Sequence, residues 1–135
     1  MSYAEILDGI HEALGGVDGI RQTLAYEPAS VQKTPAIYSL LDSITREYPG
    51  GSTVNVTWRT LHRVLIPWQD SQQAEKTLIE LADSLPAAID ADPTVGGVAQ
   101  DVSVTAGDTG WVTIDGNEYR SLDLYSEALE IAPVR

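Results

Sequence analysis

The clearest pattern of apolar and polar positions lies in residues 54–66, where the two kinds of side chain alternate. One face of this stretch is mainly apolar and includes His62, whereas the other face carries Arg59 and Arg63. A period of two residues is typical of a strand that is buried on one side. Pro67 ends the pattern because proline has no backbone N–H to give to a sheet. We therefore predict one long strand here.

The first amphipathic helix is expected near the start of the chain, from about residue 3 to residue 14. Its apolar side chains recur on one helical face, and Ser2 with Glu5 forms a capping-box pattern. Gly15 and Gly16 predict a left-handed stop at its end.

A second helix is expected in residues 70–92, directly after the long strand. Asp70 is a good N-cap, and Gln73 completes a second capping-box pattern. The apolar face comprises Leu78, Leu81, Ala82, Leu85 and Ile89. Pro86 lies inside this pattern, so we expect a kink or break in the last turn.

The remaining segments favour strands separated by turns. "AIYSLL" after Pro35 predicts a buried strand, residues 17–25 form a short strand or an irregular link, and Asp42 to Thr53 is expected to be a loop. After the second helix, "VAQDVSVTA", "WVTI" and "YRSLDLYSEALEI" predict strands. They are separated by a turn at Gly107 to Gly110 and by a hairpin turn at "DGN".

This order of elements predicts one α+β domain over residues 1–135, with a mainly antiparallel sheet and two helices packed on one face. The length fits a single domain, and 43% hydrophobic residues are enough for a core. No apolar run approaches the roughly 18 residues of a membrane span, and no signal-peptide pattern begins the chain, so neither membrane insertion nor export is expected.

The charge of the chain narrows the classes of partner. Twenty acidic residues against eight basic ones give a formal net charge of −12. Such a surface repels phosphate backbones, so specific binding to DNA or RNA is disfavoured, although DNA could pass nearby without adhering. Simple solubility is the other explanation of the same charge.

The sequence contains few residues or motifs that could form a catalytic, metal or cofactor site. The chain has no Cys, and its two histidines, His11 and His62, are far apart in sequence, which is a poor set of metal ligands. No nucleophile elbow, phosphate-binding loop or dinucleotide fingerprint occurs. We expect His62 to be a hydrogen-bonded core or interface residue, and we expect neither an enzyme nor a cofactor.

Arginine and aromatic side chains instead suggest a protein interface. Arg59 and Arg63 share one face of the long strand. The strand is rimmed by Trp58, on its apolar face, and by Trp68, at the corner after it, and arginine and aromatic residues are enriched in interface cores. Arg46 is the other arginine of this region. Alternatively, the arginines only keep an outer face soluble or blunt an edge strand.

Several segments together resemble one protein family. They are the proline-led strand "TPAIYSLL", the strand-to-helix step "WRTLHRVLIPWQDS", the late helix proline in "LADSLPAAID" and the final strand "YRSLDLYSEALEI". In this order, after a short N-terminal helix, they resemble the small tail terminator proteins of long-tailed bacteriophages. The likeness is one of element order over most of the chain.

The resemblance implies a structural protein of the virion neck, made in the host cytoplasm. Family members form a hexameric ring that caps the tail tube protein, ends its polymerisation and offers a docking surface to the head-completion or connector protein, while DNA passes through the lumen. The contact loops expected by exposure are Asp42 to Thr53 and Gly107 to Gly110, with Tyr48 and Trp111 as aromatic anchors. The alternatives are another neck or tube-related subunit and, from a different class, a small acidic protein-binding or regulatory module.

Overall fold

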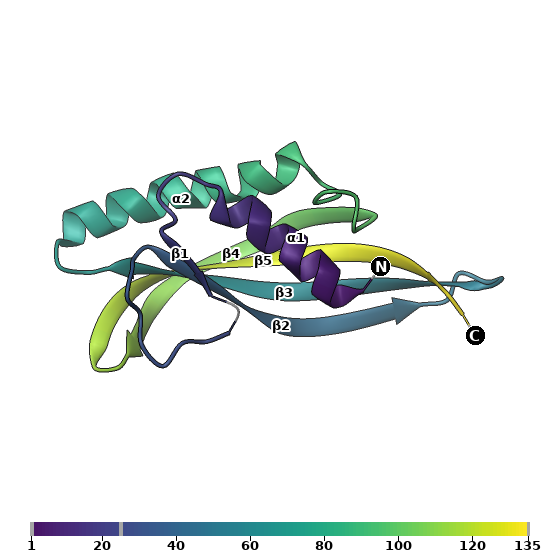
Figure 1. Ribbon diagram of the computed structural model, residues 1–135, viewed down its shortest axis with the longest axis horizontal. Coiled ribbons are helices and arrows are strands. Elements are labelled where there is room, and N and C mark those ends of the chain that lie inside the picture. The colour runs from purple at the N-terminus through teal and green to yellow at the C-terminus, as the bar shows by residue number, and fades with distance from the viewer. Residues whose placement is uncertain (1, 25, 135) are drawn as a thin grey trace.

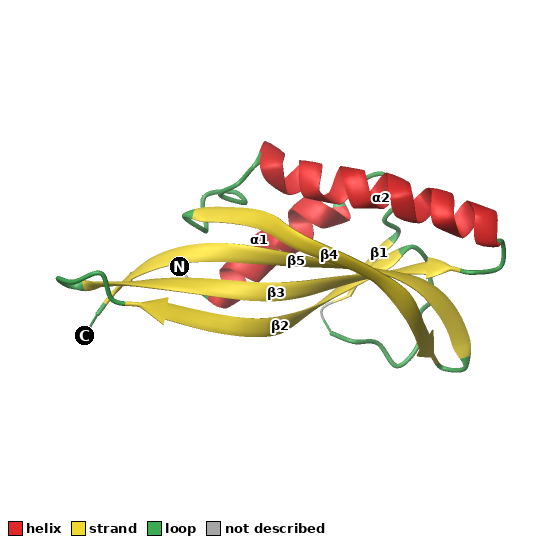
Figure 2. Ribbon diagram, turned by 180° about the vertical axis from the view of Figure 1, so that it is seen from behind, coloured by secondary structure: helices red, strands yellow, loops and turns green. Residues whose placement is uncertain are grey.

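The computed structural model describes residues 2–24 and 26–134 and contains two helices and five strands (Figure 1). In chain order the elements are α1 (Tyr3–Gly15), β1 (Gln22–Leu24), β2 (Ala36–Glu47), β3 (Thr53–Pro67), α2 (Ser71–Ala91), β4 (Asp101–Ile114) and β5 (Asn117–Pro133). Both helices lie on the same side of the sheet, as Figures 1 and 2 show from opposite directions. The predicted α+β architecture is confirmed.

The strands form one sheet in the order β1-β2-β3-β5-β4. Only the short β1 pairs in parallel, with Ala36–Tyr38, and every other pairing is antiparallel. β3 is the predicted long strand, and it pairs with β5 over its whole length, from Thr53 to Pro67. The "DGN" hairpin is also confirmed, because Asp115 and Gly116 adopt φ values of 51° and 77° between β4 and β5.

The main core lies between the helices and the sheet. The apolar faces of both helices pack on alternate residues of β3 and β5, such as Val64 and Leu122. Its fully buried large side chains include Ile6, Ile10, Leu14, Ile37, Leu81, Leu85 and Ile89. A smaller cluster of Tyr38, Leu65, Ile114 and Tyr119 lies on the opposite face at one end of the sheet, where Val31 of the 26–35 segment packs against it.

The predicted loop from Asp42 to Thr53 is wrong in extent. β2 continues to Glu47 and stays paired with β3 across a bulge at Asp42, so the connection is only residues 48–52. The prediction that "AIYSLL" is buried holds for its first four residues, Ala36 to Ser39, but not for Leu40 and Leu41, which are 39% and 45% exposed. The second half of β2 lies beyond β1, and no strand in the described part of the chain pairs with its outer side.

The predicted turn at Gly107 to Gly110 is also wrong. β4 passes through both glycines as one strand, with a bulge between Val104 and Ala106. The physical reason is pairing with β5. A Cβ at Gly107 would lie 3.2 Å from Leu124 Cδ2, and a Cβ at Gly110 would lie 3.3 Å from Ser121 Oγ. Glycine here permits close approach to the neighbouring side chains and does not break the strand.

Three details of the helices differ from expectation. Gly16 caps α1 with φ −82°, so the expected left-handed stop is absent there. Asp70 caps α2 as predicted, but the side chain of Gln73 donates to Thr77 and not back to the cap. Pro86 does not break α2, which continues to Ala91, so of the two alternatives the break is wrong and the kink stays a prediction.

Candidate interaction surfaces

The six residues predicted for an interface fall in three separate places. Arg46 and Tyr48 lie at the β2–β3 hairpin, Arg59 and Arg63 lie in the middle of β3, and Trp68 and Trp111 lie at the far end. The hairpin and the start of α2 are at opposite ends of the sheet (Figure 1). The fifteen residues of β3 between them span about 50 Å. The structure therefore does not gather these residues into one site.

Arg59 and Arg63 project from the sheet face that the helices leave uncovered, as the alternation predicted. Arg63 makes a two-pronged ion pair with Asp123, Nε to Oδ1 at 2.9 Å and Nη2 to Oδ2 at 3.0 Å, and its Nη1 donates to Tyr38 at 3.4 Å. The bond with Asp123 raises the pKa of Arg63. Arg59 donates to Asp42 at 3.0 Å and lies over the ring of Tyr125.

These contacts show that both arginines already have acidic partners within their own chain. Trp58 lies on the helix-covered face, as the alternation predicts, and there it stacks on Tyr3 at 4.7 Å and donates to Glu130 at 3.2 Å. Whether the arginine face also meets another protein stays a prediction.

Two aromatic contacts mark the ends of the sheet. At the hairpin, Arg46 Nε donates to the Tyr48 hydroxyl at 3.3 Å, and the Tyr48 side chain is 63% exposed. At the other end, Trp68 and Trp111 meet edge to face at 5.0 Å, and Arg120 lies over the Trp111 ring at 5.0 Å. Exposed aromatic side chains such as Tyr48, Trp68 and Trp111 are suited to contacts with other proteins, whereas Arg120 is 15% exposed and donates to Glu75 at 2.7 Å.

A buried chain of hydrogen bonds connects both histidines and was not predicted from sequence. His11 Nε2 lies 2.8 Å from Ser39 Oγ, which lies 2.7 Å from His62 Nδ1, and His62 Nε2 lies 2.7 Å from Ser126 Oγ. Ser39, His62 and Ser126 are all at most 4% exposed. The expectation of a hydrogen-bonded core histidine is therefore confirmed for His62.

The protonation of this chain follows from its geometry. A neutral imidazole offers one donor and one acceptor, so His62 donates to one serine and accepts from the other. Burial and the nearby charge of His11 lower the pKa of His62 to about 3, and burial lowers the pKa of His11. If His11 takes a proton, its Nε2–H donates to Ser39, which then donates to His62, and every bond is kept.

The same network is unsuited to catalysis. Its serine hydroxyls are buried under α1, away from any substrate, and no carboxylate orients His62 as in a catalytic triad. Among residues 2–24 and 26–134, no group of three or more His, Asp or Glu side chains is placed to hold a metal ion. In the same part of the chain, no helix has the length and apolar character needed to cross a membrane.

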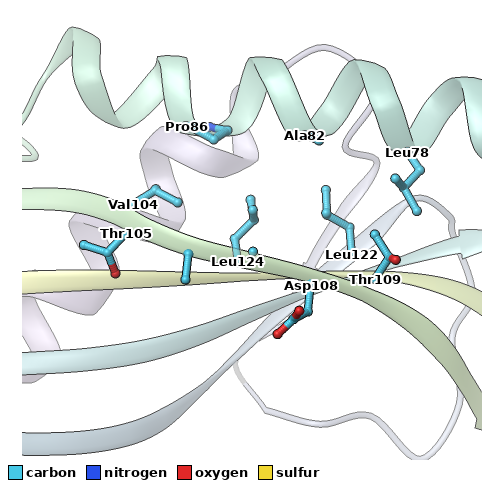
Figure 3. Close-up of a pocket in the computed structure, with 11 residues that line it drawn as sticks. Leu78, Ala82, Pro86, Val104, Thr105, Asp108, Thr109, Leu122 and Leu124 are labelled. Carbon is cyan, nitrogen blue, oxygen red and sulfur yellow. The ribbon is translucent and has the colours of Figure 1, made fainter.

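An open groove lies between α2 and the edge of the sheet and was also not predicted (Figure 3). Its volume is about 570 Å³. Leu122 and Leu124 point up from β5 and Leu78 points down from α2, while Asp108 points to the other face of the sheet. The groove exists because the residues of α2 and β4 that face it include Ala82, Pro86 and Gly107, which fill little space.

Comparison with known proteins adds no identification, because the sequence matches no protein-family model and no curated protein sequence.

Proposed function

We propose that this protein is a structural subunit of a virion neck, specifically a tail terminator. As a ring it would cap the tail tube, end tube polymerisation and dock the tail to the head. The observation that supports this role best is the distribution of contact groups. Exposed aromatic side chains lie at both ends of strands about 50 Å long, and among the described residues the sheet has free edges on both sides.

This distribution suits a subunit with several neighbours. In a ring, the sides of each subunit meet other copies, while its two ends meet different partners above and below. The hairpin with Tyr48 and the corner with Trp68 and Trp111 are the two ends, so one would meet the tail tube protein and the other the head-completion or connector protein.

The charge of the chain is compatible with DNA passing through such a ring. Each copy carries a formal charge of −12, and six copies would carry roughly six times that charge. If part of it faces the lumen, DNA is repelled from the wall and slides without adhering. Mapping the acidic residues in an assembled ring tests this, and a neutral or basic lumen would contradict it.

Electron microscopy with tail tube subunits tests the function directly. Purified protein added to polymerising tubes should stop growth and appear as a ring on one tube end, and capped tubes should then join to heads. Replacing both Tyr48 and Trp111 with Ala should impair joining at one or both ends. Unlimited tube growth in the presence of the protein would contradict the proposal.

The alternatives give different results in the same experiment. Another neck or tube-related subunit would join the particle without limiting tube length. A small acidic protein-binding module would remain a monomer and bind neither tube nor head. The second outcome would favour the α2–β4 groove as the binding site of a different partner.

A further inference from the structure

The sheet ends in two long strand edges that have no partner among the described residues. On one side β1 covers only Ala36–Tyr38, so the outer edge of β2 has no partner strand from Leu40 to Glu47. On the other side β4 pairs only with β5. Each free edge exceeds an ordinary strand of about 5–6 residues. Both expose rows of backbone N–H and C=O groups, which are a template for another strand.

The directions of the two edges suit a contact between copies of the chain. β2, β3, β5 and β4 alternate in direction, so β2 and β4 run opposite to each other. If copies are related by rotation about an axis along the strands, the β2 of one copy lies antiparallel to the β4 of the next. Such a head-to-tail contact uses two different patches and closes into a ring when the rotation permits.

Apolar side chains lie beside both edges, on the same face of the sheet. Leu41 and Ile44 are opposite Thr60 and Trp58 of β3, which places both on the helix-bearing face of the sheet. They are 45% and 48% exposed. The α2–β4 groove lies at the opposite edge of the sheet. It opens on the same face as Leu41 and Ile44 and is lined mainly by apolar atoms of residues such as Leu78 and Ala82. An added β2 strand would place its two apolar side chains against this groove.

Charge favours the same pairing. Two copies that each carry −12 repel, so a contact needs opposite charges nearby. Arg46 lies on the same face as Ile44 and forms no ion pair among the described residues. On α2, Asp83 and Asp90 are exposed and lie three residues before and four residues after Pro86, which lines the groove, so both are on the same side of the helix as Pro86. A neighbour's Arg46 would meet these carboxylates.

We propose that residues 40–47 of one copy add as a strand to β4 of a second copy, with Leu41 and Ile44 in the α2–β4 groove. The contact supplies the subunit interface of the ring and in that respect rests on the proposed function. Each edge strand contains one bulge, which is also a way to prevent unwanted strand addition. If the bulges prevent strand addition in this protein, it is a monomer, and this outcome would overturn the proposal.

Cysteine cross-linking tests the contact cleanly because the chain has no cysteine of its own. One chain carries Ile44→Cys, and a second chain, made larger by a tag, carries Thr105→Cys or Thr109→Cys. Within one chain β2 and β4 are separated by two strands, about 14 Å, which a disulfide does not span. In a glutathione redox buffer, an equal mixture should give mainly the disulfide between differently sized chains.

The control and the opposing results are equally specific. Ile131→Cys is as exposed, at 44%, but lies on the other face of the sheet, so with Thr109→Cys it should give no cross-link. Disulfides between two Ile44→Cys chains alone would show a symmetric β2–β2 contact and overturn the proposal. Absence of any cross-link, with a monomer in sedimentation at the highest accessible concentration, would also overturn it.

A second measurement separates this contact from the function on which it rests. The double variant Leu41→Asn, Ile44→Asn should weaken self-association at least about tenfold, whereas Ile131→Asn should not, and both should unfold at unchanged urea midpoints. Chains that cross-link as expected but never cap tubes would leave the contact intact and remove the terminator function. Rings that cap tubes but give no cross-link would support the terminator function and overturn the proposed contact.

Discussion

Acidification should destabilise the folded protein through His62. This side chain is 1% exposed, and burial together with His11 lowers its pKa to about 3. In the unfolded chain its pKa is about 6.5. Because the folded pKa is the lower one, the unfolded state binds the proton first. The stability that depends on neutral His62 is therefore complete above pH ~6.5 and is lost as the pH falls toward 3.

The magnitude follows from the difference between the two pKa values. Each pH unit between them corresponds to about 1.36 kcal/mol, so the free energy of unfolding should fall by about 2 kcal/mol between pH 7.5 and pH 5. The figure is almost the same for any folded pKa below about 4, since His62 is then neutral at pH 5. His11 adds to the loss in the same direction, because burial lowers its pKa as well.

Urea unfolding followed by tryptophan fluorescence measures this loss, with His62→Gln as the comparison. Glutamine can still donate and accept hydrogen bonds with Ser39 and Ser126, but it does not titrate. The two proteins contain the same carboxylates, so any contribution of these groups cancels in the difference. The wild type should lose about 2 kcal/mol more than His62→Gln between pH 7.5 and pH 5. A third protein, His11→Gln, isolates the share of His11.

Two results would refute this reasoning. The first is an equal pH dependence of unfolding in the wild type and His62→Gln. The second needs only the wild type: NMR of the histidine rings should show no titration of His62 above pH ~4. A His62 ring that titrates near its ordinary pKa would contradict the buried neutral state, even if the glutamine variant failed to fold.

Three further substitutions test other parts of the structure by urea unfolding. Asp123→Asn should lower the free energy of unfolding by about 1–2 kcal/mol, because it breaks the two-pronged pair with the half-buried Arg63; a loss below about 0.3 kcal/mol would contradict this. Pro86→Ala should raise it by about 1–3 kcal/mol, because it restores an N–H to the Ala82 carbonyl within α2; destabilisation would show that the ring of Pro86 is needed in the groove. Gly116→Ala should lower it by about 1 kcal/mol, because its φ of 77° disfavours a side chain although space is open; an unchanged midpoint would contradict the turn geometry.

Features that depend on neighbouring residues in the chain were predictable. The alternation in β3 placed His62 on one face and Arg59 and Arg63 on the other, because side-chain direction in a strand is a local property. The caps Ser2 and Asp70 were predictable for the same reason, since each bonds to N–H groups two or three residues away.

Features that depend on distant pairing were not predictable. Gly107 and Gly110 have the local character of a turn, but pairing with β5 keeps them extended. The polar second half of β2 has the local character of a loop, but β3 holds it in the sheet. The histidine network joins residues 23 to 64 positions apart, so no local pattern signals it.

Polar side chains that already have partners within the chain are unlike the surfaces that are free to contact another protein. On the helix-covered face, the buried polar side chains all have hydrogen-bond partners within the described chain. On the opposite face, Arg59 and Arg63 are paired with carboxylates of their own sheet. The groups left over include the backbone edges of β2 and β4, the apolar side chains beside them, and the exposed Tyr48 and Trp111 at the two ends of the sheet. Substitutions on the arginine face should therefore act mainly on stability, and substitutions of Leu41 or Ile44 mainly on assembly, so the two effects should be separable in the same set of variants.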